Sequence, residues 1–181
     1  MKIKQSIAVL TTFAIVCTAL LCMPAIGQTA TKLTDAEIAS VAVTANQIDI
    51  EYAQIAQKKS KNADVLKFAE TMAKDHQSVI DQAVALATKL GVTPKDNATT
   101  KSFLAGAIKT KAMLNSKNGN AFNKAYIDNE VAYHKAVISV VETMLIPQSS
   151  NAELKSLLQN VLPALKAHLA HAEMVQKSIS K

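Results

Sequence analysis

The sequence predicts an all-α protein, a bundle of four long amphipathic helices with a short extra helix between the second and the third. Two observations support this fold class. The 181 residues include only 4 Gly and 4 Pro, so helix breakers are scarce. Apolar residues also recur every three or four positions along four long stretches, which is the helical period. With 49% hydrophobic and 19% charged residues, the chain has enough apolar material for a globular core.

The first 27 residues have the pattern of a cleavable signal peptide. Two lysines near the start are followed by an apolar run to about Cys22, and small residues at Ala25 and Gly27 precede Gln28. The run is short for a membrane anchor and contains three threonines, so we expect cleavage. We therefore expect residues 28–181 to form a single exported domain with no transmembrane span after cleavage.

The cysteines and the charges narrow the classes of function. Both cysteines, Cys17 and Cys22, lie in the predicted signal peptide, so the mature chain would carry neither a disulfide nor thiol chemistry. The net charge of +6 rests on lysine alone, because the sequence contains no arginine. Without the bidentate recognition of phosphate or guanine that arginine provides, we expect no nucleic-acid partner.

The first two long helices are predicted over residues 35–58 and 63–90. A capping box of Thr34 and Glu37 opens the first helix. Gly91 is a suitable residue for ending the second helix. The apolar stripe of the first helix consists of Ile38, Val41, Ala45, Ile48, Tyr52 and Ile55. The stripe of the second helix consists of Val65, Ala69, Met72, His76, Val79, Ala83, Leu86 and Leu90.

A shorter helix and two further long helices follow. The short one is predicted over residues 99–114 and the long ones over 121–146 and 151–178, with a turn cluster at 115–120. Pro163 lies inside the last helix and should kink or split it. If the short helix carries the chain along the bundle, the connection is a long crossover; if it only caps one end, the bundle is up-down-up-down.

Several histidines and glutamates fall on the faces that we expect to be buried. His76 and His134 each lie about 14 residues into their helices, so their rings share a level if a crossover makes the two helices parallel. Glu130 lies four residues before His134 and faces the same way. The candidate metal ligands are His76, His134, His168, Glu51, Glu130 and His171.

These residue types suit a transition metal ion such as iron, zinc, manganese or copper, with imidazole nitrogens and carboxylate oxygens as ligands. The alternative is that each histidine is an ordinary interior residue, bonded to a backbone carbonyl or to a neighbour. Neither a catalytic triad nor a phosphate-binding loop is present in the sequence, and we predict no catalytic residues.

Four segments carry a family resemblance. They are 51–56 (EYAQIA), 68–76 (FAETMAKDH), 122–127 (FNKAYI) with His134 seven residues later, and 162–169 (LPALKAHL). Together they resemble bacterial exported proteins of domain-of-unknown-function family 4142, which are often labelled outer-membrane proteins. The resemblance extends over about residues 33–179, essentially all of the mature chain.

The resemblance implies a ferritin-like four-helix bundle in the periplasm or associated with the outer membrane, without an established activity. Ferritin-like di-iron enzymes carry Glu-x-x-His on two helices, whereas Ala73 and Val131 stand three residues before His76 and His134 here. Ferroxidase chemistry is therefore not expected. We predict a non-catalytic binding or stress-related protein for an unknown envelope partner or small ligand, and leave a homodimer open. The alternative is a metal-binding protein with a His/Glu site inside the bundle, and an enzyme ranks last.

Overall fold

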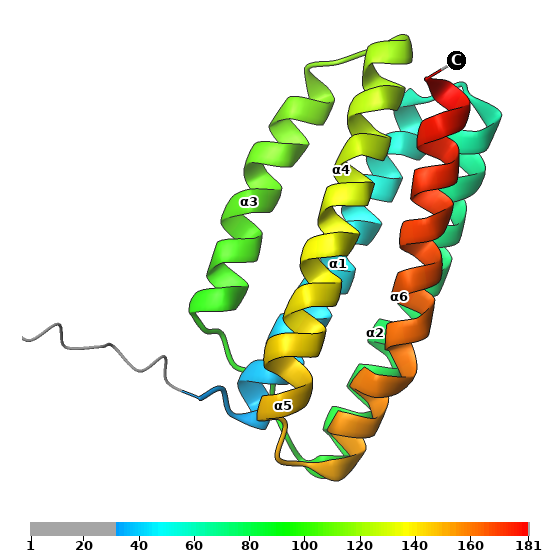
Figure 1. Cartoon of the computed structure of the whole chain (residues 1–181). Helices are drawn as coiled ribbons and strands as arrows, with labels where there is room; N and C mark the ends of the chain where they lie inside the picture. Colours follow the sequence, from blue (N-terminus) through cyan, green and yellow to red (C-terminus); the bar gives the residue numbers. More distant parts are fainter. Residues whose placement is uncertain (1–31, 181) are drawn as a thin grey trace, which may run out of the picture. The chain divides into compact units, whose positions relative to one another are not determined.

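The computed structural model describes residues 32–180, and all its regular elements are helical. They are α1 (Asp35–Lys59), α2 (Ala63–Leu90), α3 (Ala98–Asn115), α4 (Gly119–Val140), the π-helical turn η1 (Val141–Leu145), α5 (Ile146–Gln148) and α6 (Ala152–Ile179). The predicted all-α bundle, with an extra helix between the second and third long ones, is confirmed (Figure 1). The predicted signal peptide, residues 1–27, lies outside the described residues. Within those described, no helix is both long and apolar enough to cross a membrane.

The bundle has the crossover topology, one of the two that the sequence left open. Helices α1 and α6 run in one direction, and α2 and α4 run in the other (Figure 1). Helix α3 lies along the outside of the bundle and returns the chain to the end where α4 begins. It packs mainly against α1, while α1 also contacts α2 and α4. As a result α1 is covered on several sides, and α2 and α4 are parallel.

The helix ends form as the sequence predicted. The Glu37 N–H donates to Thr34 Oγ1 at 3.3 Å, and the Thr34 N–H donates back to the Glu37 carboxylate at 2.9 Å. The Asn62 side chain accepts from the Val65 N–H at 3.1 Å and caps α2. Gly91 ends α2 with φ of 63°, a left-handed conformation that favours glycine. These caps satisfy backbone groups that the helix itself leaves free.

Two prolines affect the helix backbone in different ways. Helix α6 is continuous through Pro163 and is not split there. Because Pro163 is exposed, water can reach the backbone near the hydrogen bond that the ring removes. The predicted helix over 121–146 instead contains η1. Pro147 follows this turn, and since proline has no N–H and crowds the preceding turn, it accounts for the local widening.

The core consists of two apolar clusters. The first is built around residues such as Tyr52, Phe68, Met72, Phe122, Tyr126 and Ala172. The second is built around residues such as Ile38, Val41, Val137, Leu145, Leu158 and Leu165. Between the two clusters, each of the four long helices contributes buried polar residues. This polar layer, as we call it below, consists of Asp49, His76, Glu130, His134 and His168.

Candidate metal centre

Three histidines from three helices meet in the polar layer. His76 comes from α2, His134 from α4 and His168 from α6, and their side chains are buried. The ring centroid of His76 lies 5.7 Å from that of His134 and 5.2 Å from that of His168. The centroids of His134 and His168 are 5.7 Å apart. The parallel course of α2 and α4 therefore puts His76 and His134 at one level, and the return of α6 adds the third ring.

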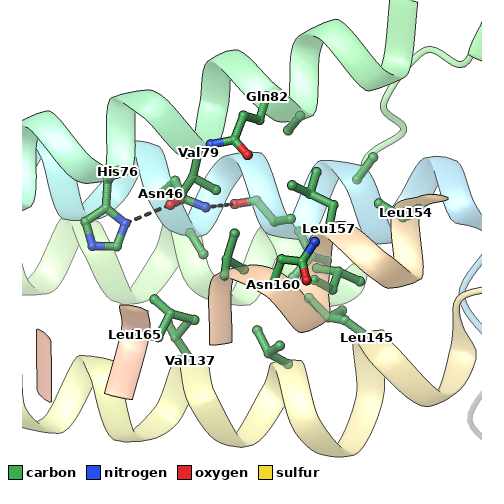
Figure 2. Close-up of a pocket in the computed structure, with 18 of the residues that line it drawn as sticks. Asn46, His76, Val79, Gln82, Val137, Leu145, Leu154, Leu157, Asn160 and Leu165 are labelled. Carbon is green, nitrogen blue, oxygen red and sulfur yellow. Dashed lines mark hydrogen bonds between the residues drawn. The ribbon is translucent and has the colours of Figure 1, made fainter. Parts of the chain in front are cut away.

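The tautomer of His76 follows from its neighbours. The Asn46 amide donates through Nδ2 to the Ala42 carbonyl at 2.8 Å, so its oxygen Oδ1 is left to accept. This oxygen lies 2.7 Å from His76 Nδ1, and both bonds are drawn in Figure 2. Nδ1 must therefore carry the proton, because Oδ1 can only accept. The lone pair of His76 is consequently on Nε2, which is buried and has no hydrogen-bond partner among residues 32–180.

The other two rings are held in the same manner. His134 Nδ1 donates to the Glu130 carbonyl at 3.0 Å, which leaves the lone pair on Nε2. His168 Nε2 donates to the Asp75 carboxylate at 3.1 Å, which leaves the lone pair on Nδ1. Both free nitrogens are buried without a partner in the described part of the chain. Each histidine thus has one nitrogen fixed by an acceptor, and ligand atoms of the three rings lie within 4.8 Å of one another.

Asp49 faces the lone pairs of two of these rings. Its Oδ2 lies 3.4 Å from His76 Nε2 and 3.6 Å from His134 Nε2. The carboxylate is fully buried, and neither of its oxygens has a hydrogen-bond partner within residues 32–180. A tetrahedral metal ion with bonds of about 2.1 Å would hold its ligand atoms roughly 3.4 Å apart. The two distances from Asp49 Oδ2 to the ring nitrogens therefore match the spacing of ligands that share one ion.

Burial shifts the pKa values of the cluster toward the uncharged forms. Burial raises the pKa of Asp49 to about 8. Burial, together with the charged forms of His134 and His168, lowers the pKa of His76 to about 3. The pKa of His134 falls to about 4, mainly through burial. At neutral pH the rings of His76 and His134 therefore offer lone pairs, and the Asp49 carboxyl retains its proton unless a cation replaces it.

Glu130 extends the cluster on the side of α4. Its carboxylate is fully buried, and Oε2 lies 3.7 Å from His134 Nδ1. Burial and the charge of Asp49 raise the pKa of Glu130 well above its usual range. Asp49, Glu130 and His134 form a second group whose ligand atoms lie within 4.8 Å of one another. The structure thus brings four of the six residues singled out in the sequence, together with Asp49, into one polar layer.

The remaining two candidates lie elsewhere. Glu51 Oε2 is 2.6 Å from the ammonium group of Lys111 on α3, and both side chains are partly exposed. The His171 ring packs edge-on against Phe68, with centroids 5.1 Å apart. Neither Glu51 nor His171 belongs to a potential metal-binding group in the described residues.

Two residues of the site were missed in the sequence. Asp49 follows Ala45 by four positions and precedes Tyr52 by three, and this spacing to two members of the predicted stripe was the available signal. Asp75 is not among the candidates from the sequence. Its side chain is 45% exposed, yet it accepts the hydrogen bond that orients His168.

A crossover four-helix bundle with a histidine and carboxylate cluster at its centre defines the class of this protein. The chain belongs to the family described as a domain of unknown function (DUF4142), whose sequence model matches residues 21–175. A similar solved structure is that of CopM in the Cu(II)-bound form, with a TM-score of 0.60 and 14% sequence identity. The match covers 81% of this chain and 98% of that chain, and at this identity it shows the fold alone. No curated protein sequence matches the chain.

Proposed function

We propose that this protein binds a divalent transition metal ion at the centre of its bundle. The ligand atoms would be Nε2 of His76, Nε2 of His134, Nδ1 of His168 and Oδ2 of Asp49, with Glu130 as a further carboxylate. The observation that carries the proposal is the meeting of three buried histidines, two of whose lone pairs face the buried Asp49 carboxylate, which has no hydrogen-bond partner among residues 32–180. In proteins, a metal-binding histidine commonly donates its second N–H to a carboxylate, a carbonyl or a similar acceptor, as each of these rings does.

Hydrogen bonding within the cluster cannot satisfy these atoms. The buried unpartnered atoms of the polar layer within residues 32–180 are both oxygens of Asp49, both oxygens of Glu130, Nε2 of His76, Nε2 of His134 and Nδ1 of His168. All of them are acceptors when the carboxylates are ionised. Protons on the two carboxyl groups would supply two donors, and the other buried unpartnered donors among residues 32–180 are only Tyr126 Oη and Asn129 Nδ2. Leaving buried polar atoms unpaired costs free energy, and a cation would satisfy several of them at once.

The ligand types favour Cu(II) or Zn(II), with Fe(II) and Mn(II) as further candidates. Imidazole nitrogens suit copper, zinc and iron, and copper binds most tightly among the divalent ions of this series. The similar solved structure is a Cu(II)-bound form of CopM, which makes Cu(II) the first ion to test here. The two carboxylates would balance the charge of the ion. We infer a binding role rather than a catalytic one, because four or five protein ligands would largely surround the metal.

The predicted signal peptide would place this site in the cell envelope. A metal-binding bundle there would store or sequester the ion, in agreement with the binding or stress-related role expected from the sequence. Ferroxidase chemistry is not part of the proposal, since the Glu-x-x-His pairs of that chemistry are missing from the sequence.

The test is a metal titration of the purified protein, with Cu(II), Zn(II), Fe(II) and Mn(II) each added to the metal-free form. We expect one ion per chain, a raised melting temperature and, for Cu(II), nitrogen hyperfine splitting in the electron paramagnetic resonance spectrum. His134→Ala should abolish stoichiometric binding. His171→Ala is the matched control, because it removes a histidine outside the cluster, and should bind normally. Full binding by a folded His134→Ala variant, or no binding by the unaltered protein, would overturn the proposal.

A further inference from the structure

An apolar cavity extends from the polar layer into one half of the bundle (Figure 2). Its volume is about 410 Å³, and its walls come from α1, α2, α4, η1 and α6. Aliphatic side chains form most of the lining, among them Val79, Val137, Leu145, Leu157 and Leu165. An engineered apolar void of about 150 Å³ in another protein already binds benzene. A cavity of this size is therefore large enough for a small organic ligand.

In this half of the bundle, several cavity-lining residues of α2 and α6 are only partly covered. The sequence predicted that Val79, Ala83 and Leu86 would be buried, and the structure leaves them only partly covered. Val65 and Met72, earlier on the same stripe, are completely buried. Opposite them on α6, Leu157 and Val161 are also partly exposed, although they line the cavity.

The two ends of the cavity differ in chemistry. Asn46, Asp49 and His76 provide polar atoms at one end, next to the proposed metal centre. Gln82 and Asn160 point into the space from opposite helices further along, as Figure 2 shows. The walls between and beyond them are aliphatic. A ligand that fits this pattern has an aliphatic body and one small polar group.

The charges on the lining favour a polar group without charge. No lysine lines the cavity in the described part of the chain, whereas three aspartates do: Asp35, Asp49 and Asp75. A carboxylate or phosphate head would therefore find no lysine as a countercharge there and would face the carboxylates of Asp35 and Asp75. A buried cationic head would compete with the proposed metal ion for the same acceptors. A hydroxyl group carries no charge, and it can accept a hydrogen bond from the second hydrogen of the Asn46 amide, whose first hydrogen bonds to the Ala42 carbonyl.

We propose that this cavity binds a medium-length aliphatic alcohol or a molecule with the same chemistry, an alkyl chain carrying one uncharged hydroxyl. The chain would lie against Val79, Leu157 and Leu165, and the hydroxyl would lie near Asn46 and His76. This binding goes beyond the proposed metal function and does not require the ion. The expected partner is thus a small amphiphile rather than a protein or a charged lipid head group.

Calorimetric titration of the purified protein with 1-hexanol, 1-octanol and 1-decanol tests the proposal. Each added methylene should lower Kd about fourfold until the cavity is filled. The heat capacity change on binding should be negative, as for burial of apolar surface. Decanoate should bind at least tenfold more weakly than 1-decanol. Equal binding of decanoate, or a Kd that does not depend on chain length, would overturn the proposal.

Two substitutions on α2 distinguish alcohol binding in the cavity from binding on the outer surface. Ala83→Phe fills the cavity from its wall and should weaken 1-decanol binding at least tenfold. Ala85→Phe adds the same ring at an exposed position outside the lining and should leave Kd unchanged. Val161→Phe repeats the filling from α6 if Ala83→Phe does not fold. Equal binding by a folded filled variant and by Ala85→Phe would contradict the proposal.

The result of the alcohol-binding experiments does not depend on whether the metal proposal is correct. Metal stoichiometry is measured on the same Ala83→Phe protein, in which the ligand atoms of the polar layer are unchanged. Alcohol binding is measured on His134→Ala. Loss of alcohol binding with metal binding intact supports the cavity assignment alone, and failure of metal binding leaves the alcohol experiment interpretable.

Discussion

His76 and Asp49 face each other across the interface of α1 and α2, with Nε2 and Oδ2 3.4 Å apart. The proton of His76 is on Nδ1, where Asn46 accepts it, so only the carboxyl group can place a proton between the two atoms. The same Asp49 oxygen lies 3.6 Å from the lone pair of His134. A proton on Asp49 can bond to one ring only, whereas a metal ion would bond to both.

Metal affinity should therefore depend on pH through Asp49. Its pKa is raised to about 8, while those of His76 and His134 are lowered to about 3 and 4. Between pH 5 and 8 an entering ion displaces the Asp49 proton but no proton of His76 or His134. The Kd should fall about tenfold for each unit of pH in this range, with Glu130 able to add to the slope. Chelator-competition titrations from pH 5.5 to 8.5 measure it.

The Asp49→Asn variant is the control for that experiment. Its amide carries no titrating proton, so the part of the slope due to Asp49 should disappear and the remaining affinity should be weaker. A transition centred near pH 6.5 in the unaltered protein would instead indicate ordinary exposed histidine ligands and would contradict the geometry of the polar layer.

The metal-free protein should be most stable near pH 6. The folded-state pKa of Asp49 is raised, so its contribution to stability is complete below about pH 4 and is lost as pH rises toward 8. The folded-state pKa values of His76 and His134 are lowered, so stability is lost as pH falls below about 6.5. Thermal unfolding across pH 4 to 9 should show a maximum between these limits, and Asp49→Asn should flatten the alkaline side. A melting temperature that rises steadily from pH 6 to 9 would refute this account.

Asn46 should influence the metal affinity by orienting the His76 ring. In Asn46→Ala the acceptor for His76 Nδ1 is lost, so the ring is free to change tautomer and orientation. Removing such a supporting partner typically weakens metal binding by about 10–100-fold. Gln47→Ala, at the exposed neighbouring position, should leave affinity unchanged. The measurement is the Kd for Cu(II) or Zn(II) together with the melting temperature, which separates lost orientation from lost fold.

The capping box at the start of α1 should affect stability without affecting the metal. Thr34→Ala removes the side-chain bond to the Glu37 N–H and should lower the free energy of unfolding by about 1 kcal/mol. For a domain of this size this corresponds to a melting temperature lower by about 2–4 °C. Metal affinity should stay the same because Thr34 lies far along α1 from Asp49. A large loss of affinity in this variant would show that the helix end and the polar layer are coupled.

The helices and the positions of the three histidines could be predicted from the sequence because both depend on local spacing. The apolar period and the caps located the long helices almost to their ends, and the same period put His76, His134 and His168 on inner faces. It was harder to predict from the sequence which carboxylate of α1 enters the polar layer. Asp49 and Glu51 both lie near the predicted stripe, and which one enters the polar layer depends on where α3 packs. Because α3 covers the other side of α1, Glu51 pairs with Lys111 and Asp49 is left to face the histidines.

The cavity could not be read from the sequence for a related reason. Apolar spacing along α2 shows which face turns inward, but it does not show whether the opposite helix comes close enough to cover it. Val79 and Ala83 therefore continue the stripe of Val65 and Met72 without sharing their burial. Separation of helices is set by the volumes of side chains from several distant segments, which a periodic pattern in one segment does not contain.

The polar layer takes at least one side chain from each of the four long helices: Asp49 from α1, His76 from α2, Glu130 and His134 from α4, and His168 from α6. An ion held there would act as a cross-link between segments that are more than a hundred residues apart in the chain. It could leave, by way of the adjoining cavity, only after its bonds to several helices had broken. Its departure would then be timed by the successive loss of several bonds rather than by the strength of any single one, so that a fully loaded molecule would release its ion slowly even to a powerful chelator.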